Sequence, residues 1–136
     1  MDLYNREIIS YSISLNPDFE QIREMLHGLT KKLPSGATPI FHSGQGWQYR
    51  HAAYQGNLKE HNMIQSMSCK GNCMDNGAME NFFGRLKVEM FYGEKFNSVE
   101  DFIDKLHSYI YYYNNERISL KLKGMSPVQY RTHLQI

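Results

Sequence analysis

The stretch from Asp75 to Tyr92 constrains the fold of this chain more than any other part of the sequence. It reads DNGAMENFFGRLKVEMFY, and Asp75 is a plausible N-cap because its side chain can accept from the free amides of a first helical turn. Apolar residues recur at helical spacing and predict one buried face. They are Met79, Phe82, Phe83, Leu86 and Met90. The stretch therefore predicts an amphipathic helix that packs against a core.

The opposite face of this helix is polar, and it comprises Asn76, Glu80, Gly84 and Lys87. A carboxylate and an ammonium stand there two turns apart, about 10 Å along the axis. The glycine between them allows a large molecule to approach closely. Such a face suits a site that holds a metal at one end and a phosphate at the other. The alternative is an ordinary amphipathic helix whose charges are solvated.

A second informative stretch, FHSGQGWQY, runs from Phe41 to Tyr49. It is an apolar strand end that enters a glycine-rich turn. Residues 38–42 predict a short buried strand, and ligands of α/β sheets bind at the loops that follow the carboxyl ends of strands. His42 and Ser43 therefore either lie near a site or serve packing and turn formation.

Taken together, the two stretches resemble the DDE transposases of insertion sequences, whose catalytic core is similar to that of retroviral integrases. In that family the second metal-binding acid is the Asp of an HSDQG-type motif. The third acid is the Glu of a DNAxxE-type motif, with a basic residue seven positions later. Glu80 matches the third acid and Lys87 the basic residue, and 35 residues separate positions 44 and 80, as is typical of the family. Gly44 stands at the position of the second acid.

Smaller features also carry the resemblance. Asn76, Phe82 and Phe83 fit the family, and Gly77 stands where Ala is common. Near the end of the chain, the family pattern YYN…R…L.G.TP…YR fits at nine positions. They are Tyr112, Tyr113, Asn114, Arg117, Leu122, Gly124, Pro127, Tyr130 and Arg131. Ser126 replaces the usual Thr, and Ser119 stands where His is common.

The resemblance implies an α/β, ribonuclease H-like integrase core. We expect residues 1–134 to be a truncated version of it, with a helical tail at 98–134 and without the central first strand, which should lie before Met1. About three strands and four to five helices are expected. The predicted strands are 7–14, 38–42 and 63–68. The predicted helices follow Asn16-Pro17, cover 49–60 and 75–92, and begin at Ser98 and at Ser126-Pro127.

The resemblance also implies metal-dependent phosphoryl transfer with two Mg (or Mn) ions held by acids. Here Glu80 alone would bind metal, because Gly44 has no side-chain oxygen and the first Asp is missing. We therefore expect a catalytically inactive transposase fragment, which an Asp restored at position 44 would not rescue. The alternative is a non-catalytic module that binds nucleic acid or modulates the assembly of an intact transposase.

Composition limits the domain number, the location and the partners that can be expected. With 136 residues, 41% of them apolar and 21% charged, the chain is expected to be one globular domain. It has no apolar run long enough to span a membrane, so a cytoplasmic protein is expected. The resemblance implies that it is associated with the nucleoid. A net charge of +1 does not by itself indicate a nucleic-acid partner. The resemblance implies that the chain binds DNA, both at the ends of the mobile element and at the target site. It also implies assembly with further copies of the chain or with an intact transposase. The candidate DNA contacts are Lys87, Asn76, Arg117, Lys121 and Lys123. The alternative for the basic residues near the end of the chain is a solvated surface.

Overall fold

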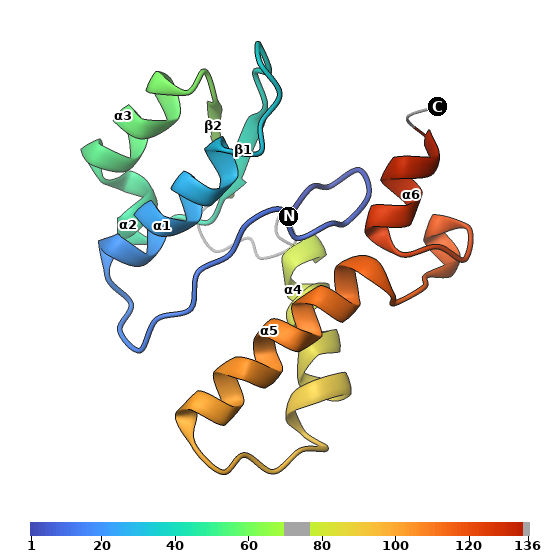
Figure 1. Cartoon of the computed structure of the whole chain (residues 1–136). Coiled ribbons are helices and arrows are strands. Elements are labelled where there is room, and N and C mark those ends of the chain that lie inside the picture. The colour runs from blue at the N-terminus through green and yellow to red at the C-terminus, as the bar shows by residue number, and fades with distance from the viewer. Residues whose placement is uncertain (70–76, 135–136) are drawn as a thin grey trace. The chain divides into compact units, whose positions relative to one another are not determined.

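The computed structural model describes residues 1–69 and 77–134 (Figure 1). The chain divides into two compact units, one of Met1–Ile9 with Ala78–Ile136 and one of Ser10–Gly77. The predicted α/β class is confirmed. The described residues contain six α-helices and two strands, rather than three strands and four to five helices.

The Ser10–Gly77 unit is built around a parallel pair of strands. After α1 (Phe19–Thr30), the chain forms β1 (Ile40–Ser43), α2 (Trp47–Arg50), α3 (Ala52–Glu60) and β2 (Ile64–Met67). Parallel neighbours need a crossover connection, which α2 and α3 supply. The strands predicted at 38–42 and 63–68 are therefore present, each displaced by one or two residues at its ends.

The core of this unit lies on one face of the strand pair. Leu26 of α1, Tyr54 and Leu58 of α3 and Met63 are buried together, and Phe41 of β1 packs against them. Figure 1 shows α1 and α3 on the same side of β1 and β2. Because side chains alternate along a strand, Ile40 and Ile64, which are paired across the sheet, point to the opposite face. They are 69% and 57% exposed.

The start of α1 differs from the prediction. Asp18 rather than Asn16 is the N-cap, and its side chain accepts from the Gln21 amide at 3.1 Å. The helix predicted at 49–60 is interrupted at His51, which has extended backbone. The His51 side chain accepts from the Ala53 amide at 3.1 Å and so begins α3 anew.

The strand predicted at residues 7–14 is wrong, since no residue of this segment joins a β-ladder. A strand needs the backbone of a neighbour as its hydrogen-bond partner. Here side chains take that role. The Ile8 amide donates to Asn114 Oδ1 at 2.8 Å and the Ile8 carbonyl accepts from Asn114 Nδ2 at 2.9 Å. Further along, the Ser12 carbonyl accepts from Gln21 Nε2 at 3.2 Å.

The other unit is helical. It contains α4 (Gly77–Leu86), the π-helix η2 (Lys87–Phe91), α5 (Val99–Asn115), the 3-10 helix η3 (Leu120–Leu122) and α6 (Pro127–Leu134). The run of α4 and η2 packs along α5, and Figure 1 shows the two lying together. Their buried side chains form a single cluster with one residue of the N-terminal segment. The cluster consists of Ile8, Phe82, Met90, Tyr109, Ile110 and Tyr113.

Two helix starts in this unit confirm the predictions. Ser98 Oγ accepts from the Asp101 amide at 3.0 Å, at the beginning of α5. At α6, Ser126 Oγ accepts from the Gln129 amide at 3.3 Å, and Gln129 Oε1 accepts from the Ser126 amide at 3.0 Å. This reciprocal pair is a capping box.

In the described parts of the chain, no helix is both long enough and apolar enough to cross a membrane.

Candidate functional site

The polar face predicted on the central helix is present on α4. Glu80 lies in its first turn and Lys87 directly after its end, and both side chains are exposed. Seven helical steps place them on the same face. A Cβ added at Gly84, between them, would meet no atom within 4 Å, so the surface there is open. Asp75 and Asn76, which the prediction placed at the start of this helix, lie outside the described residues.

The apolar face of this helix is only partly as predicted. Phe82 and Met90 are buried, and Met79 and Leu86 are partly buried against the same cluster. Phe83, in contrast, is 50% exposed. Because it is one helical step from Phe82, it lies at the border of the two faces, where its ring meets the Phe82 ring edge-on at 5.4 Å. The surface near Glu80 and Lys87 therefore includes an aromatic ring.

The helix changes its form at the basic residue. From Lys87 to Phe91 the chain is a π-helix, and the Tyr92 amide donates to the Lys87 carbonyl, five residues earlier, at 2.8 Å. The chain is helical up to Phe91, close to the predicted end at Tyr92, but its last turn is a π-helix. π-helices are uncommon and occur mostly as single turns, and π turns are also found at helix C-termini. Lys87 is the first residue of the π turn that ends this helix.

Arg117, a predicted DNA contact, lies beside this turn and is paired with Glu89. Its Nε donates to both carboxylate oxygens of Glu89, at 2.6 and 2.9 Å. The Tyr109 hydroxyl donates to the same carboxylate at 3.2 Å. The hydrogen bond to Glu89 raises the pKa of Arg117, and burial, followed by the Glu89 charge, raises the pKa of Tyr109. The charge of Arg117 is therefore already compensated within the protein.

The other predicted cationic contacts are open to solvent. Lys121 lies in η3 and Lys123 directly after it, in a left-handed conformation at φ 57°. Both side chains are exposed, as is Lys87. Among the described residues, none of these three lysines forms an ion pair. Their charges are available to a ligand.

The turn that contains Gly44 follows β1 in the Ser10–Gly77 unit. The Ser43 hydroxyl donates to the Gly44 carbonyl at 3.0 Å, and the Gln45 side chain donates to the Ser68 carbonyl at 2.9 Å. The imidazole of His42 is hydrogen-bonded to Ser66 Oγ at 2.9 Å and to Ser68 Oγ at 3.2 Å. The bonds of His42 thus connect β1 to β2 and to Ser68 after it, whereas the bond of the Ser43 hydroxyl lies within the turn.

The metal ions that the resemblance implies do not fit these side chains. Two divalent ions close together require several anionic oxygens. Glu80 provides one carboxylate, whereas Gly44, which belongs to the other unit, provides no side-chain oxygen. Within residues 1–69 and 77–134, no three His, Cys, Asp or Glu side chains are grouped as a metal ion would need. No catalytic step through a metal ion follows from this donor set.

Several residues of the tail pattern hold the N-terminal segment in place. The Tyr113 hydroxyl donates to the Arg6 carbonyl at 2.9 Å, next to the two bonds between Asn114 and Ile8. Arg131 Nε donates to Glu7 Oε2 at 2.8 Å, which raises the pKa of Arg131.

The same segment is also tied to the start of α6. Asn5, only 1% exposed, donates through Nδ2 to the Pro127 carbonyl at 3.1 Å and to Glu7 at 3.0 Å. Apart from the bond between Asn5 and Glu7, these contacts join residues more than 100 positions apart, and sequence reasoning missed them for that reason.

Comparisons with known proteins agree with this architecture. Two family models, both described as integrase core domain, match residues 1–73 and 80–134. The chain therefore belongs to the integrase core domain family.

Its relatives include transposases of insertion sequences. Over 131 residues, 96% of the chain, it is 54% identical to an uncharacterized transposase-like protein of Haemophilus influenzae, covering 60% of that protein. It is 51% identical to the putative transposase InsK for insertion sequence element IS150 of Escherichia coli, and covers 46% of it. To transposase InsF for insertion sequence IS3A of E. coli it is 37% identical, over 96% of the chain and 46% of that protein. The chain thus spans about half the length of these relatives.

Proposed function

We propose that this chain is an integrase core segment of an insertion-sequence transposase that binds DNA but does not itself catalyse phosphoryl transfer. The observation that carries the proposal is the open face of α4, where Glu80 and Lys87 flank Gly84, combined with glycine at position 44. The transposases among its relatives support the assignment. We include in it a ribonuclease H-like fold and a single core domain over residues 1–134, with the helical tail at 98–134.

The binding surface is assigned to the exposed lysines of the helical unit. Lys87 lies at one end of the open face, and Lys121 and Lys123 are exposed in and after η3. Ammonium groups of this kind bind phosphate oxygens and release counterions from DNA, which makes the affinity depend on salt. Asn76, which lies outside the described residues, is proposed as a further DNA contact by the family resemblance alone. The DNA ligands would be element ends and target, and binding of this kind would place the protein on the nucleoid.

We attribute the absence of catalysis to the lack of enough carboxylate side chains to bind the metal ions. The reaction of the family uses one metal ion to activate the attacking oxygen and another to stabilise the leaving oxygen. An acid that should help to bind them is replaced by Gly44, so Glu80 lacks the carboxylate with which it would share the ions. We propose that Glu80 in this chain is a remnant of the metal site.

A nicking assay tests the catalytic half of this proposal. With supercoiled plasmid and Mg²⁺ or Mn²⁺, we expect no nicking by the purified chain, and the same result for Glu80→Gln. Turnover that Glu80→Gln abolishes would show that the chain is an active enzyme.

A binding titration tests the other half. We expect salt-dependent binding to a fluorescent duplex, with Lys87→Ala lowering the slope of log affinity against log salt by about 1. The matched control is Lys59→Ala, which removes an exposed charge from α3 in the other unit. No binding at any salt concentration, or equal losses for the two variants, would refute the proposed surface.

The family resemblance also suggests assembly with further copies of the chain or with an intact transposase. Sedimentation of the chain, alone and mixed with a full-length relative, tests this part of the proposal independently of DNA.

A further inference from the structure

The contacts of Arg117 decide whether it can bind DNA directly. Its side chain is 19% exposed and that of Glu89 28%, so the pair is partly buried. Both oxygens of the carboxylate lie within 2.9 Å of Arg117 Nε. A phosphate that approached Arg117 would have to displace Glu89 or lie next to its negative charge. Like charges at such a distance repel strongly where water is partly excluded, so this geometry disfavours a phosphate contact.

The same contacts connect the end of α5 to η2. Glu89 lies in the middle of the π turn, while Tyr109 and Arg117 belong to α5 and the segment directly after it. Tyr109 is only 6% exposed, which fixes the position of its hydroxyl group. The three side chains form part of the wall of a hollow of about 550 Å³ next to η2. We call them the Glu89 clamp.

π-helices are rare and occur mostly as single turns, so we expect this turn to depend on the tertiary contacts of Glu89. Here the turn begins at Lys87, whose carbonyl accepts the bond from Tyr92. The direction of the Cα–Cβ bond of a residue follows from the backbone angles of its own turn. A change of the turn from π to α geometry would therefore alter how Lys87 is presented.

We infer that Arg117 is a positioning residue, which acts on DNA binding through the Glu89 clamp and the π turn that carries Lys87, and does not itself contact DNA. This inference rests on the proposed function, because it assumes that Lys87 binds DNA. It differs from the sequence-based expectation, in which Arg117 contacts DNA, because it assigns Arg117 to the support of the turn that carries Lys87.

Glu89→Gln separates the two roles of Arg117 by the sign of its effect. If Arg117 contacted phosphate, loss of the carboxylate would free it and strengthen DNA binding. If Arg117 acts through the clamp, Glu89→Gln weakens DNA binding several-fold, as Arg117→Met does. Tyr109→Phe, a milder change that removes one bond to Glu89, has a smaller effect in the same direction. In a Lys87→Ala background, Arg117→Met produces no further fall in the salt slope, whereas a direct contact would lower it again by about 0.9.

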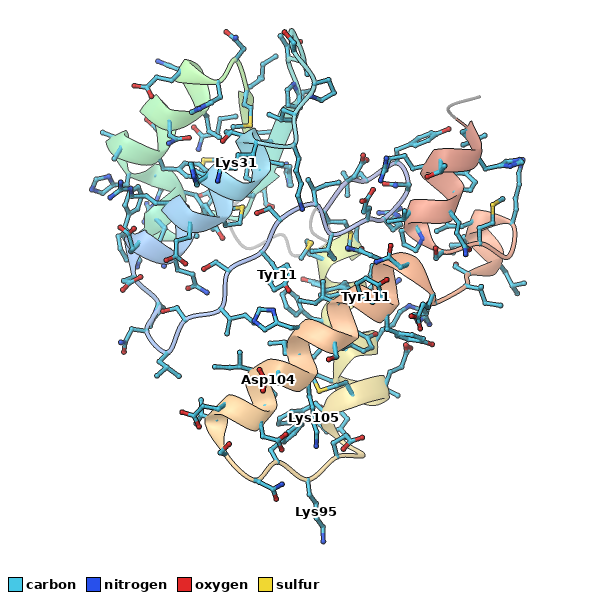
Figure 2. All side chains as sticks on the ribbon, in the orientation of Figure 1. Tyr11, Lys31, Lys95, Asp104, Lys105 and Tyr111 are labelled. Carbon is cyan, nitrogen blue, oxygen red and sulfur yellow. The ribbon has the colours of Figure 1, made fainter. Side chains whose placement is uncertain are left out.

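Glu94→Gln is the matched control for charge. Glu94 lines the same hollow but is paired with Lys105 of α5 at 3.4 Å, and Figure 2 labels that lysine. The substitution removes the same negative charge and leaves the clamp intact. We expect it to leave DNA affinity unchanged or slightly higher.

Hydrogen exchange provides a measurement that does not involve DNA. Exchange of the Tyr92 amide, which closes the π turn, should become faster in Glu89→Gln and Arg117→Met but not in Glu94→Gln. If exchange of the Tyr92 amide is unchanged, the inference is wrong and the proposed function still stands. The same holds if Glu89→Gln binds DNA more tightly while binding still depends on Lys87. Failure of the unsubstituted chain to bind DNA, or binding that is indifferent to Lys87→Ala, refutes the proposed function and the inference with it.

Discussion

At the scale of single residues, the Asn114 side chain forms the hydrogen bonds to Ile8 that a neighbouring strand would otherwise provide. Its amide group accepts from the Ile8 amide and donates to the Ile8 carbonyl, at 2.8 and 2.9 Å. Ile8 is 7% exposed, so Asn114→Ala leaves two backbone groups without partners and largely without water. We expect it to lower the free energy of unfolding by about 1–3 kcal/mol for each group left unpaired, measured by urea denaturation.

Asn115→Ala is the control for this prediction. Asn115 follows Asn114 in α5, and its side chain donates to the Tyr111 carbonyl at 3.0 Å in an exposed position. Its removal should change the free energy of unfolding by no more than about 0.5 kcal/mol. Similar losses for the two variants would mean that the contact of Asn114 with the N-terminal segment contributes nothing specific.

The roles that were hardest to predict belong to residues whose bonding partners are distant in the sequence and are brought close by the tertiary structure. Glu80, Gly84 and Lys87 could be placed on one face of a helix, because residues four and seven positions apart lie on the same side of it. Arg117 could not be interpreted in this way, since Glu89 is 28 positions away and only the packing of η2 on α5 brings the two together. A basic residue in a motif indicates a positive charge, and the sequence does not show whether that charge is already compensated.

At the scale of elements, helices were predictable and the strand at 7–14 was not. A helix closes its hydrogen bonds within its own segment, so a cap and an apolar stripe are sufficient to indicate it. The alternation in residues 7–14 is typical of a strand, but a strand also requires a neighbour, about which a local pattern says nothing. The π turn at Lys87 was missed for the same reason, because the contacts of Glu89 that support it are tertiary.

The capping box of α6 provides a test at this scale. Ser126 is fully buried and exchanges two hydrogen bonds with Gln129 at the start of the helix. Ser126→Ala should lower the free energy of unfolding by about 0.5–2 kcal/mol, since an amide of the first turn loses its acceptor. Ser119→Ala is the matched change, because Ser119 precedes η3 without any capping bond from its side chain. Equal effects on the urea midpoint would contradict a capping role for Ser126.

At the scale of the whole molecule, both units bury tyrosines whose ionisation opposes folding. Burial raises the pKa of Tyr54 in one unit and of Tyr109 and Tyr113 in the other. In the unfolded chain these phenols ionise near pH 10, so above that pH the unfolded state releases protons that the folded state retains. Stability should therefore be complete below about pH 10 and fall as the pH rises further.

The measurement is the urea midpoint at a series of alkaline pH values, together with tyrosinate absorbance. Tyr109→Phe should reduce the fall of the midpoint with pH, because one of the groups that oppose folding is removed. A midpoint that does not change above pH 10, or tyrosinate absorbance that is complete before unfolding begins, would contradict the assigned burial.

Charge on this scale is nearly balanced, with 15 Lys and Arg against 14 Asp and Glu. Long-range attraction to DNA is therefore weak, and affinity must come from a few cations in the correct place. We expect Lys121→Ala combined with Lys123→Ala to lower the slope of log affinity against log salt by about 2. Lys31→Ala combined with Lys59→Ala gives a chain of the same net charge by substitutions in the other unit, and its slope should stay at the original value. If the two double variants lose the same amount, binding follows net charge, and the local surface around Lys87 is not the one that meets DNA.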